Sequence, residues 1–73
     1  MSATGIAAEI AGTVLSIECA PGQQVQAEDV LLVIESMKME IPVVASRSGR
    51  VSAIGVAAGD VVEEGQTLLT IEG

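Results

Sequence analysis

The sequence repeats itself at a constant offset of 37 residues, and this repeat constrains the fold more than any other feature. Residues 12–35 align with residues 49–72 without a gap, and ten of the 24 aligned positions are identical. Self-similarity at a fixed period indicates an internal duplication. We therefore expect residues 1–73 to form a single pseudo-two-fold domain with halves of about 8–36 and 45–73. The halves should pack on one another, because neither can bury its apolar face alone.

The residue types in each half favour β-strands. The chain has 17 Val and Ile residues against five Leu, and β-branched side chains favour the pleated backbone. Glycines interrupt the sequence too often for a long helix. The pattern predicts a small sandwich or barrel with roughly four short strands in each half. The clearest apolar segments are residues 14–17, 30–34, 41–45, 51–56 and 67–71.

Matching turns are predicted in the two halves. Gly22 and Gly59 occupy the first turn at equivalent positions. In the second turn, Glu28 stands where the other half has Gly65. If this turn requires a positive φ, Glu28 carries a small strain that Gly65 avoids.

The composition excludes several classes of catalytic and metal site. The chain has no His and one Cys, which rules out the usual catalytic triads, an imidazole-bound metal, an internal disulfide and a multi-cysteine zinc site. We expect no metal site and no catalytic residue. Cys19 aligns with Val56 of the other half, which predicts a buried and unreactive thiol.

The charge disfavours two classes of partner. Ten acidic residues against three basic ones give a net charge of −7, whereas nucleic acids and anionic membranes bind positive surfaces. The longest strongly apolar run has five residues, and the first residues lack the basic region of a signal peptide. We expect a cytoplasmic protein that binds neither nucleic acid nor membrane. Arg47 and Arg50 flank the turn into the second half and are expected to be solvated charges.

A single lysine stands between the two halves. Lys38 is the only lysine of the chain, and its neighbours Met37 and Met39 are the only methionines besides Met1. Apolar segments flank residues 36–40, which predicts a tight hairpin tip with Lys38 at its apex. Two exposed methionines at a tip are costly unless a partner recognises them.

Lys38 fits a modification target better than a catalytic group. An ammonium group close to acidic residues is a poor general base, so the amine is expected to be acylated by another enzyme. Two alternatives stay open at this point. Lys38 could be a solvated charge with Met37 and Met39 as core residues, or the chain could be an interaction module in which Lys38→Arg is silent.

The segment from Glu35 to Glu40, Glu-Ser-Met-Lys-Met-Glu, resembles the attachment motif of the biotinyl domains of biotin carboxyl carriers. In that family the central lysine of an (Ala or Ser)-Met-Lys-Met tetrapeptide is biotinylated. The resemblance covers about residues 6–72 and extends to short stand-alone bacterial biotin/lipoyl attachment proteins. It implies an all-β fold, a flattened β-barrel or sandwich of two four-stranded antiparallel sheets, with the modified lysine on a hairpin tip.

The resemblance also implies roles for the residues of the motif. Lys38 would carry biotin attached by biotin protein ligase. A biotin carboxylase would load carboxylate and a carboxyltransferase would unload it, so the chain would be a carrier and not an enzyme. Lipoyl domains share the fold and also acylate a hairpin lysine, so lipoate, for acyl or aminomethyl transfer, is the alternative cofactor. The expected recognition residues are Met37, Met39, Glu35, Ser36 and Glu40.

Overall fold

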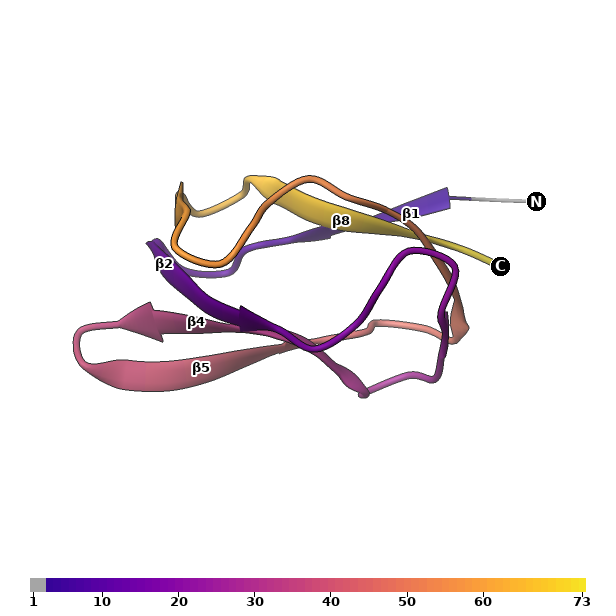
Figure 1. The fold of residues 1–73 in the computed structure, drawn as a ribbon, viewed down its shortest axis with the longest axis horizontal. Coiled ribbons are helices and arrows are strands. Elements are labelled where there is room, and N and C mark those ends of the chain that lie inside the picture. The colour runs from indigo at the N-terminus through magenta and orange to yellow at the C-terminus, as the bar shows by residue number, and fades with distance from the viewer. Residues whose placement is uncertain (1–2) are drawn as a thin grey trace.

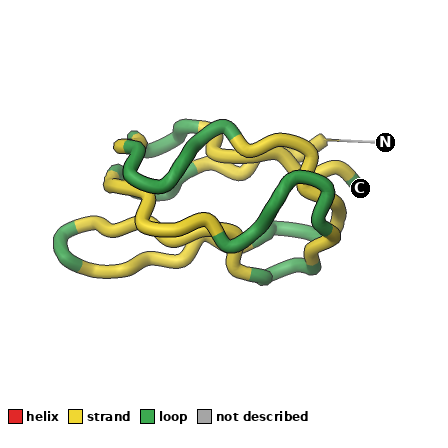
Figure 2. Tube along the Cα trace, viewed as in Figure 1, coloured by secondary structure: helices red, strands yellow, loops and turns green. Residues whose placement is uncertain are grey.

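The computed structural model describes residues 3–73 and contains eight strands there (Figure 1). Met1 and Ser2, which the predicted domain includes, lie outside the described residues. Loops and turns join the strands, and Figure 2 shows no helix over residues 3–73. The strands are β1 (Ala3–Ala7), β2 (Gly12–Ile17), β3 (Gln24–Val25), β4 (Val30–Ser36), β5 (Met39–Val44), β6 (Gly49–Ile54), β7 (Val61–Val62) and β8 (Thr67–Glu72).

The strands form two antiparallel sheets that stack face to face (Figure 1). One sheet has the order β1-β8-β6-β3 and the other the order β5-β4-β2-β7. The predicted all-β fold of two four-stranded sheets is therefore confirmed. The molecule measures 36 × 17 × 17 Å. The connection between β4 and β5 projects from one end, and the described chain begins and ends at the other (Figure 1).

The offset of 37 residues also relates the two sheets. It carries β2 onto β6 and β3 onto β7 without a change of bounds, and it carries β1 and β4 onto β5 and β8. Each half places its two-residue strand in the sheet built mainly by the other half. Equivalent hydrogen bonds join the two halves next to these short strands. The Gly22 N–H donates to the Val51 carbonyl, and the Gly59 N–H donates to the Val14 carbonyl, both at 2.7 Å. The halves are therefore interlocked.

The second turn of each half adopts a positive φ. Gly65 has φ 88° and Glu28, its counterpart, has φ 73°. An L-residue crowds its own carbonyl in this region at a cost of about 1 kcal/mol. Glu28 thus carries the strain that the sequence comparison anticipated. Gly22 and Gly59 also have positive φ, at 88° and 95°.

Different side chains perform the same task in equivalent turns. In the first turn, Gln23 and its counterpart Asp60 each accept a hydrogen bond from the backbone N–H three residues earlier, at 3.0 and 2.9 Å. In the second turn, Asp29 and its counterpart Gln66 do the same, at 2.9 and 3.0 Å. Amide and carboxylate oxygens both satisfy a turn N–H. The turns therefore stay equivalent although the residue types have diverged.

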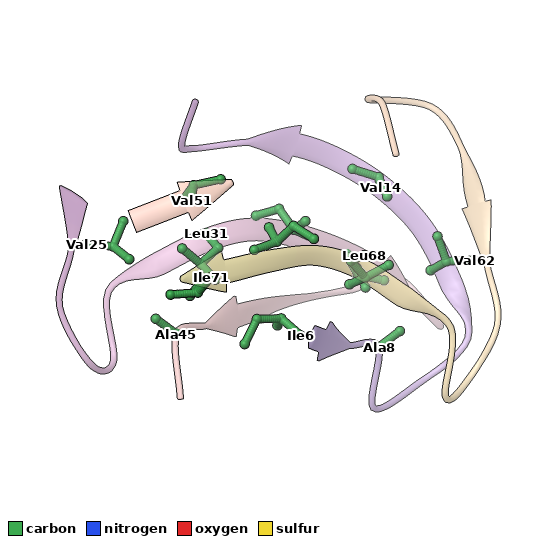
Figure 3. Packing of buried hydrophobic residues seen from close by; sticks show 13 residues of the cluster. Ile6, Ala8, Val14, Val25, Leu31, Ala45, Val51, Val62, Leu68 and Ile71 are labelled. Atoms are coloured by element: carbon green, nitrogen blue, oxygen red, sulfur yellow. The ribbon is translucent and has the colours of Figure 1, made fainter. Parts of the chain in front are cut away.

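The core lies between the sheets and consists of aliphatic side chains (Figure 3). No polar or charged side chain is buried among the described residues. Both halves contribute matched positions, so burial depends on the two sheets facing each other. The buried residues are Ile6, Ala8, Val14, Val25, Leu31, Leu32, Ile34, Ala45, Val51, Val62, Leu68, Leu69 and Ile71.

Two expectations about single residues need correction. Cys19 is half-buried, not buried, and packs against the edge of the core; burial raises the pKa of its thiol. Arg47 is not a simple solvated charge. Its guanidinium donates to the Thr4 hydroxyl at 3.4 Å and to the Gly73 carbonyl at 3.2 Å, which ties β1 to the C-terminal residue.

The close approach of β2 to β4 gives a test of the fold. A Cβ at Gly12 would collide with the Glu35 carbonyl oxygen and would lie 2.7 Å from Cγ2 of Ile34. We expect Gly12→Ala to lower the free energy of unfolding by about 2 kcal/mol or more, because backbone atoms cannot move aside cheaply. The measurement is urea unfolding followed by far-ultraviolet circular dichroism.

Gly55→Ala is the matched control. A Cβ at Gly55 would meet only the Leu68 carbonyl oxygen, at 3.5 Å, which is an ordinary contact. This variant should change the free energy of unfolding by less than about 0.5 kcal/mol. Equal losses in the two variants would contradict the packing described here.

Candidate functional site

Met37 and Lys38 form a two-residue loop between β4 and β5. The last pair of the ladder is Ser36 opposite Met39, so the loop closes immediately after it. Both loop residues have positive φ, 53° for Met37 and 65° for Lys38. Two successive positive φ values in a two-residue hairpin loop are the signature of a type I′ turn, which matches the right-handed twist of the strands. The structure thus places Lys38 at the tip of a hairpin.

This backbone conformation is unusual for the residues that adopt it. Type I′ turns are normally built from Asn-Gly, Asp-Gly or Gly-Gly, which tolerate positive φ. Met37 and Lys38 each cost about 1 kcal/mol in this region. The β4–β5 ladder, which pairs residues from Val30 to Ser36 with residues from Met39 to Val44, holds them there. The hairpin therefore fixes the position of the lysine backbone against its local preference.

The side chains of the tip point into solvent. Met37 is 89% exposed and Met39 is 64% exposed, and Lys38 is exposed as well. The alternative in which Met37 and Met39 are core residues is therefore wrong. Two exposed thioethers beside one amine form an apolar surface that water solvates poorly, and such methionines suit adaptable recognition surfaces.

The other residues of the motif surround this tip. Glu35 and Glu40 are exposed and lie directly opposite each other in the ladder, one pair below Ser36 and Met39. Like charges at opposed positions destabilise a sheet. Ser36 is half-buried. The structure thus brings all six motif residues together at one end of the molecule, with two carboxylates close to the lysine.

Among residues 3–73, the sheet related by the repeat has no hairpin equivalent to the tip. Where β4 and β5 are joined by Met37 and Lys38, β8 ends at Glu72 and β1 begins at Ala3, and these two residues pair with each other. Within residues 3–73, Lys38 is therefore presented at the end of the molecule opposite to the pair of Ala3 and Glu72 (Figure 1).

The described residues offer little other chemistry. None of them form a cluster of three or more His, Cys, Asp or Glu side chains that could hold a metal ion. No helix within residues 3–73 is long and apolar enough to cross a membrane. An exposed primary amine is a nucleophile once a base removes its proton, and an external enzyme can supply that base. The arrangement suits covalent attachment of a group to Lys38.

Comparison with known proteins identifies the family. Residues 1–71 match the protein family described as "Biotin-requiring enzyme". The chain belongs to this family. The family resemblance inferred from the lysine motif is therefore confirmed.

Individual relatives support this membership. The biotinylated protein TB7.3 homolog of Mycobacterium leprae is 44% identical over 69 residues, which are 94% of this chain and 97% of the relative. The biotin carboxyl carrier protein of Streptococcus mutans is 39% identical over 70 residues, 96% of this chain and 54% of the relative. The urea carboxylase of Kluyveromyces lactis contains a region with a TM-score of 0.93 and 35% identity, which covers 99% of this chain and 6% of that one.

Reasoning from the sequence missed two features of the site. It did not give the turn type, because Met37 and Lys38 lack the residues that usually mark type I′. It also did not place Glu35 opposite Glu40. Counting outward from a two-residue loop would have found this pair, since the ladder is regular next to the tip.

The strain at the tip gives a second test. We expect Met37→Asn to raise the free energy of unfolding by about 0.5–1 kcal/mol, because Asn adopts positive φ more readily than Met. Met39→Asn is the control. Met39 lies in β5, where Asn is disfavoured, so this variant should be neutral or less stable. The measurement is urea unfolding, and a gain of the same size in both variants would contradict the turn assignment.

Proposed function

We propose that this protein is a biotin carboxyl carrier whose cofactor is attached to Lys38. The observation that carries the proposal is a single lysine, exposed at a constrained hairpin tip, in a chain of the biotin-requiring family. The relatives' names refer to biotin and to carboxylases, which favours biotin over lipoate. We further propose that residues 1–73 act as one carrier domain, with the repeat halves at about 8–36 and 45–73.

Attachment is an acyl transfer to the lysine amine. Biotin protein ligase supplies biotin as its acyl adenylate. The Lys38 Nζ lone pair attacks the acyl carbon, an amide C–N bond forms, the C–O bond to the phosphate breaks, and AMP leaves. The Lys38 ammonium loses one proton before the attack and the nitrogen loses a second as the amide forms, and we assign the removal of both to the ligase. The net charge changes from −7 to −8 as the ammonium becomes a neutral amide.

The carrier role follows from the tether. When bound, biotin accepts a carboxyl group from a biotin carboxylase and gives it up at a carboxyltransferase. Lys38 holds it on a flexible arm, which raises its effective concentration at both enzymes to about the millimolar range. The strained turn fixes where the arm begins. The protein itself contributes no catalytic group to either reaction.

Met37, Met39, Glu35, Ser36 and Glu40 are the proposed recognition residues. Exposed methionines are enriched in the central parts of interfaces, and a pair of carboxylates next to them suits a basic partner surface. Because these residues lie on both sides of Lys38, they contact any enzyme that modifies the Lys38 amine or binds the cofactor attached to it. We place the protein in the cytoplasm, where ATP for ligation and for carboxylation is available.

Intact mass spectrometry tests this function. After co-expression with a biotin protein ligase in the presence of biotin, we expect the mass to rise by one biotinyl group. Peptide mapping should place the group on Lys38. The reason is that one amine at the tip is presented to the ligase while the rest of the described surface holds no other lysine.

Lys38→Arg is the control, because a guanidinium cannot form the amide while it keeps the positive charge. This variant should fold and gain no mass. A folded wild-type chain that gains no biotinyl group would contradict the proposal. A gain of one lipoyl group from endogenous enzymes would instead assign the protein to acyl or aminomethyl transfer.

A further inference from the structure

The outer faces of the two sheets differ at positions that the repeat makes equivalent. On the β5-β4-β2-β7 sheet, six outward positions carry larger apolar side chains, and we call this surface the apolar outer face. It consists of Leu15, Val30, Val33, Pro42, Val44 and Val61. The equivalent positions of the other sheet carry small or polar residues, in the same order Ser52, Thr67, Thr70, Gly5, Ala7 and Gln24.

The residues of the apolar outer face are exposed except for Val33, which is half-buried, and the polar Ser16 lies opposite Val33 on the same surface. Val30 pairs with Val44 across β4 and β5, and their side chains are 43% and 41% exposed. Val33 pairs with Pro42 in the same ladder and lies between the buried Leu32 and Ile34, so it points away from the core. On β2 and β7, Leu15 is 40% exposed and Val61 is 75% exposed.

The other sheet serves as an internal control for this difference. Val and Thr are both β-branched and form strands about equally well, so strand formation does not require Val at these positions. Thr67 and Thr70 show that the same scaffold accepts polar residues, and the Ser52 hydroxyl donates to the Thr70 carbonyl at 3.3 Å. At these six pairs of positions, Leu, Val and Pro occur on the sheet that carries Lys38, and the other sheet has Gly, Ala, Ser, Thr and Gln. An exposed apolar surface of this kind indicates a binding site.

The charges around the face indicate what covers it. Glu35 and Glu40 lie on the same sheet in a row with Thr13 and Val61, so two carboxylates border the apolar outer face at the end nearest the tip. Each copy of the chain carries a net charge of −7, so charge repulsion opposes the approach of a second copy. Self-association is therefore disfavoured. A protein surface with an apolar centre and a border of Lys and Arg fits both the face and the two carboxylates.

We propose that the apolar outer face is the docking surface for the carboxylase enzyme that receives the Lys38 arm. This inference rests on the proposed function. Strands β4 and β5 carry both the face and the tip, so an enzyme seated on the face has the arm directed along its own surface. Docking holds the carrier while the flexible arm finds the active site. The other sheet, which has no tip, has no such surface.

The test exchanges residues between equivalent positions of the two sheets. The double variant Val30→Thr/Val33→Thr introduces into the apolar outer face the residue type found at the equivalent positions of the other sheet, Thr67 and Thr70. Thr67→Val/Thr70→Val makes the reverse change on the other sheet and is the matched control. Both variants keep β-branched residues, and their folding is checked by thermal denaturation. Each is fully biotinylated before use, as judged by intact mass.

Steady-state kinetics then measure each biotinylated carrier as a substrate of the source organism's biotin carboxylase and carboxyltransferase. For Val30→Thr/Val33→Thr, we expect the KM for the carrier to rise about tenfold with at least one enzyme, because the two added hydroxyls would lose water on docking without gaining a hydrogen-bond partner. The kcat should stay within about twofold, because the arm and tip are unchanged. The control should keep both parameters within about twofold of wild type.

Several results would overturn the docking surface. An unchanged KM with both enzymes, or an equal rise in the control, would remove the link to this face. A fall in the rate of biotinylation alone would assign the face to the ligase. A wild-type dimer that the Val30→Thr/Val33→Thr variant abolishes in sedimentation would assign it to a second copy. In all of these cases the biotinylated wild-type protein is still a substrate of the two enzymes. If the proposed function itself is wrong, neither enzyme uses any biotinylated form of the chain as a substrate.

Discussion

Each half of this chain can bury its apolar face only against the other half, and the rest of the structure depends on this mutual burial. The halves exchange their two-residue strands, so that each sheet is completed by a strand from the opposite half. A core of aliphatic side chains without aromatic residues tolerates little misplacement, because small branched side chains fill space only at close approach. Gly12 and Gly49 show how close that approach is: a Cβ would lie 2.7 Å from an Ile Cγ2 at either position. The interlocked sheets form a rigid base.

That rigid base allows the strained tip. Met37 and Lys38 hold positive φ without glycine or asparagine because the paired strands on either side constrain the two-residue loop. At the equivalent end of the other sheet, Ala3 pairs with Glu72. The outer faces differ in the same direction, with apolar side chains on the sheet of the tip and polar ones on the other. The tip and the apolar outer face thus differ between the two sheets, whereas the core and the geometry of the turns have stayed alike.

Much of this could be predicted from the sequence, and the failures have physical reasons. The repeat, the β class and the hairpin around Lys38 follow from spacing and residue type. Strands β1, β3 and β7 were not among the clear apolar segments, since β1 has a single large apolar residue and the other two have two residues each. Arg47 was expected to be solvated because its partners, Thr4 and Gly73, lie at the two ends of the sequence. The turn type at Met37 and Lys38 is imposed by strand pairing, which local residue preference does not reveal.

The central claim is that the folded scaffold, and not the hexapeptide alone, presents Lys38 to its ligase. The most direct measurement compares kcat/KM for biotinylation of the intact protein with that of a synthetic peptide of residues 35–40, capped at both ends. A peptide that samples the type I′ conformation about 1% of the time should react about 100-fold more slowly. We expect such a loss for the peptide. Equal kcat/KM values for peptide and protein would contradict it.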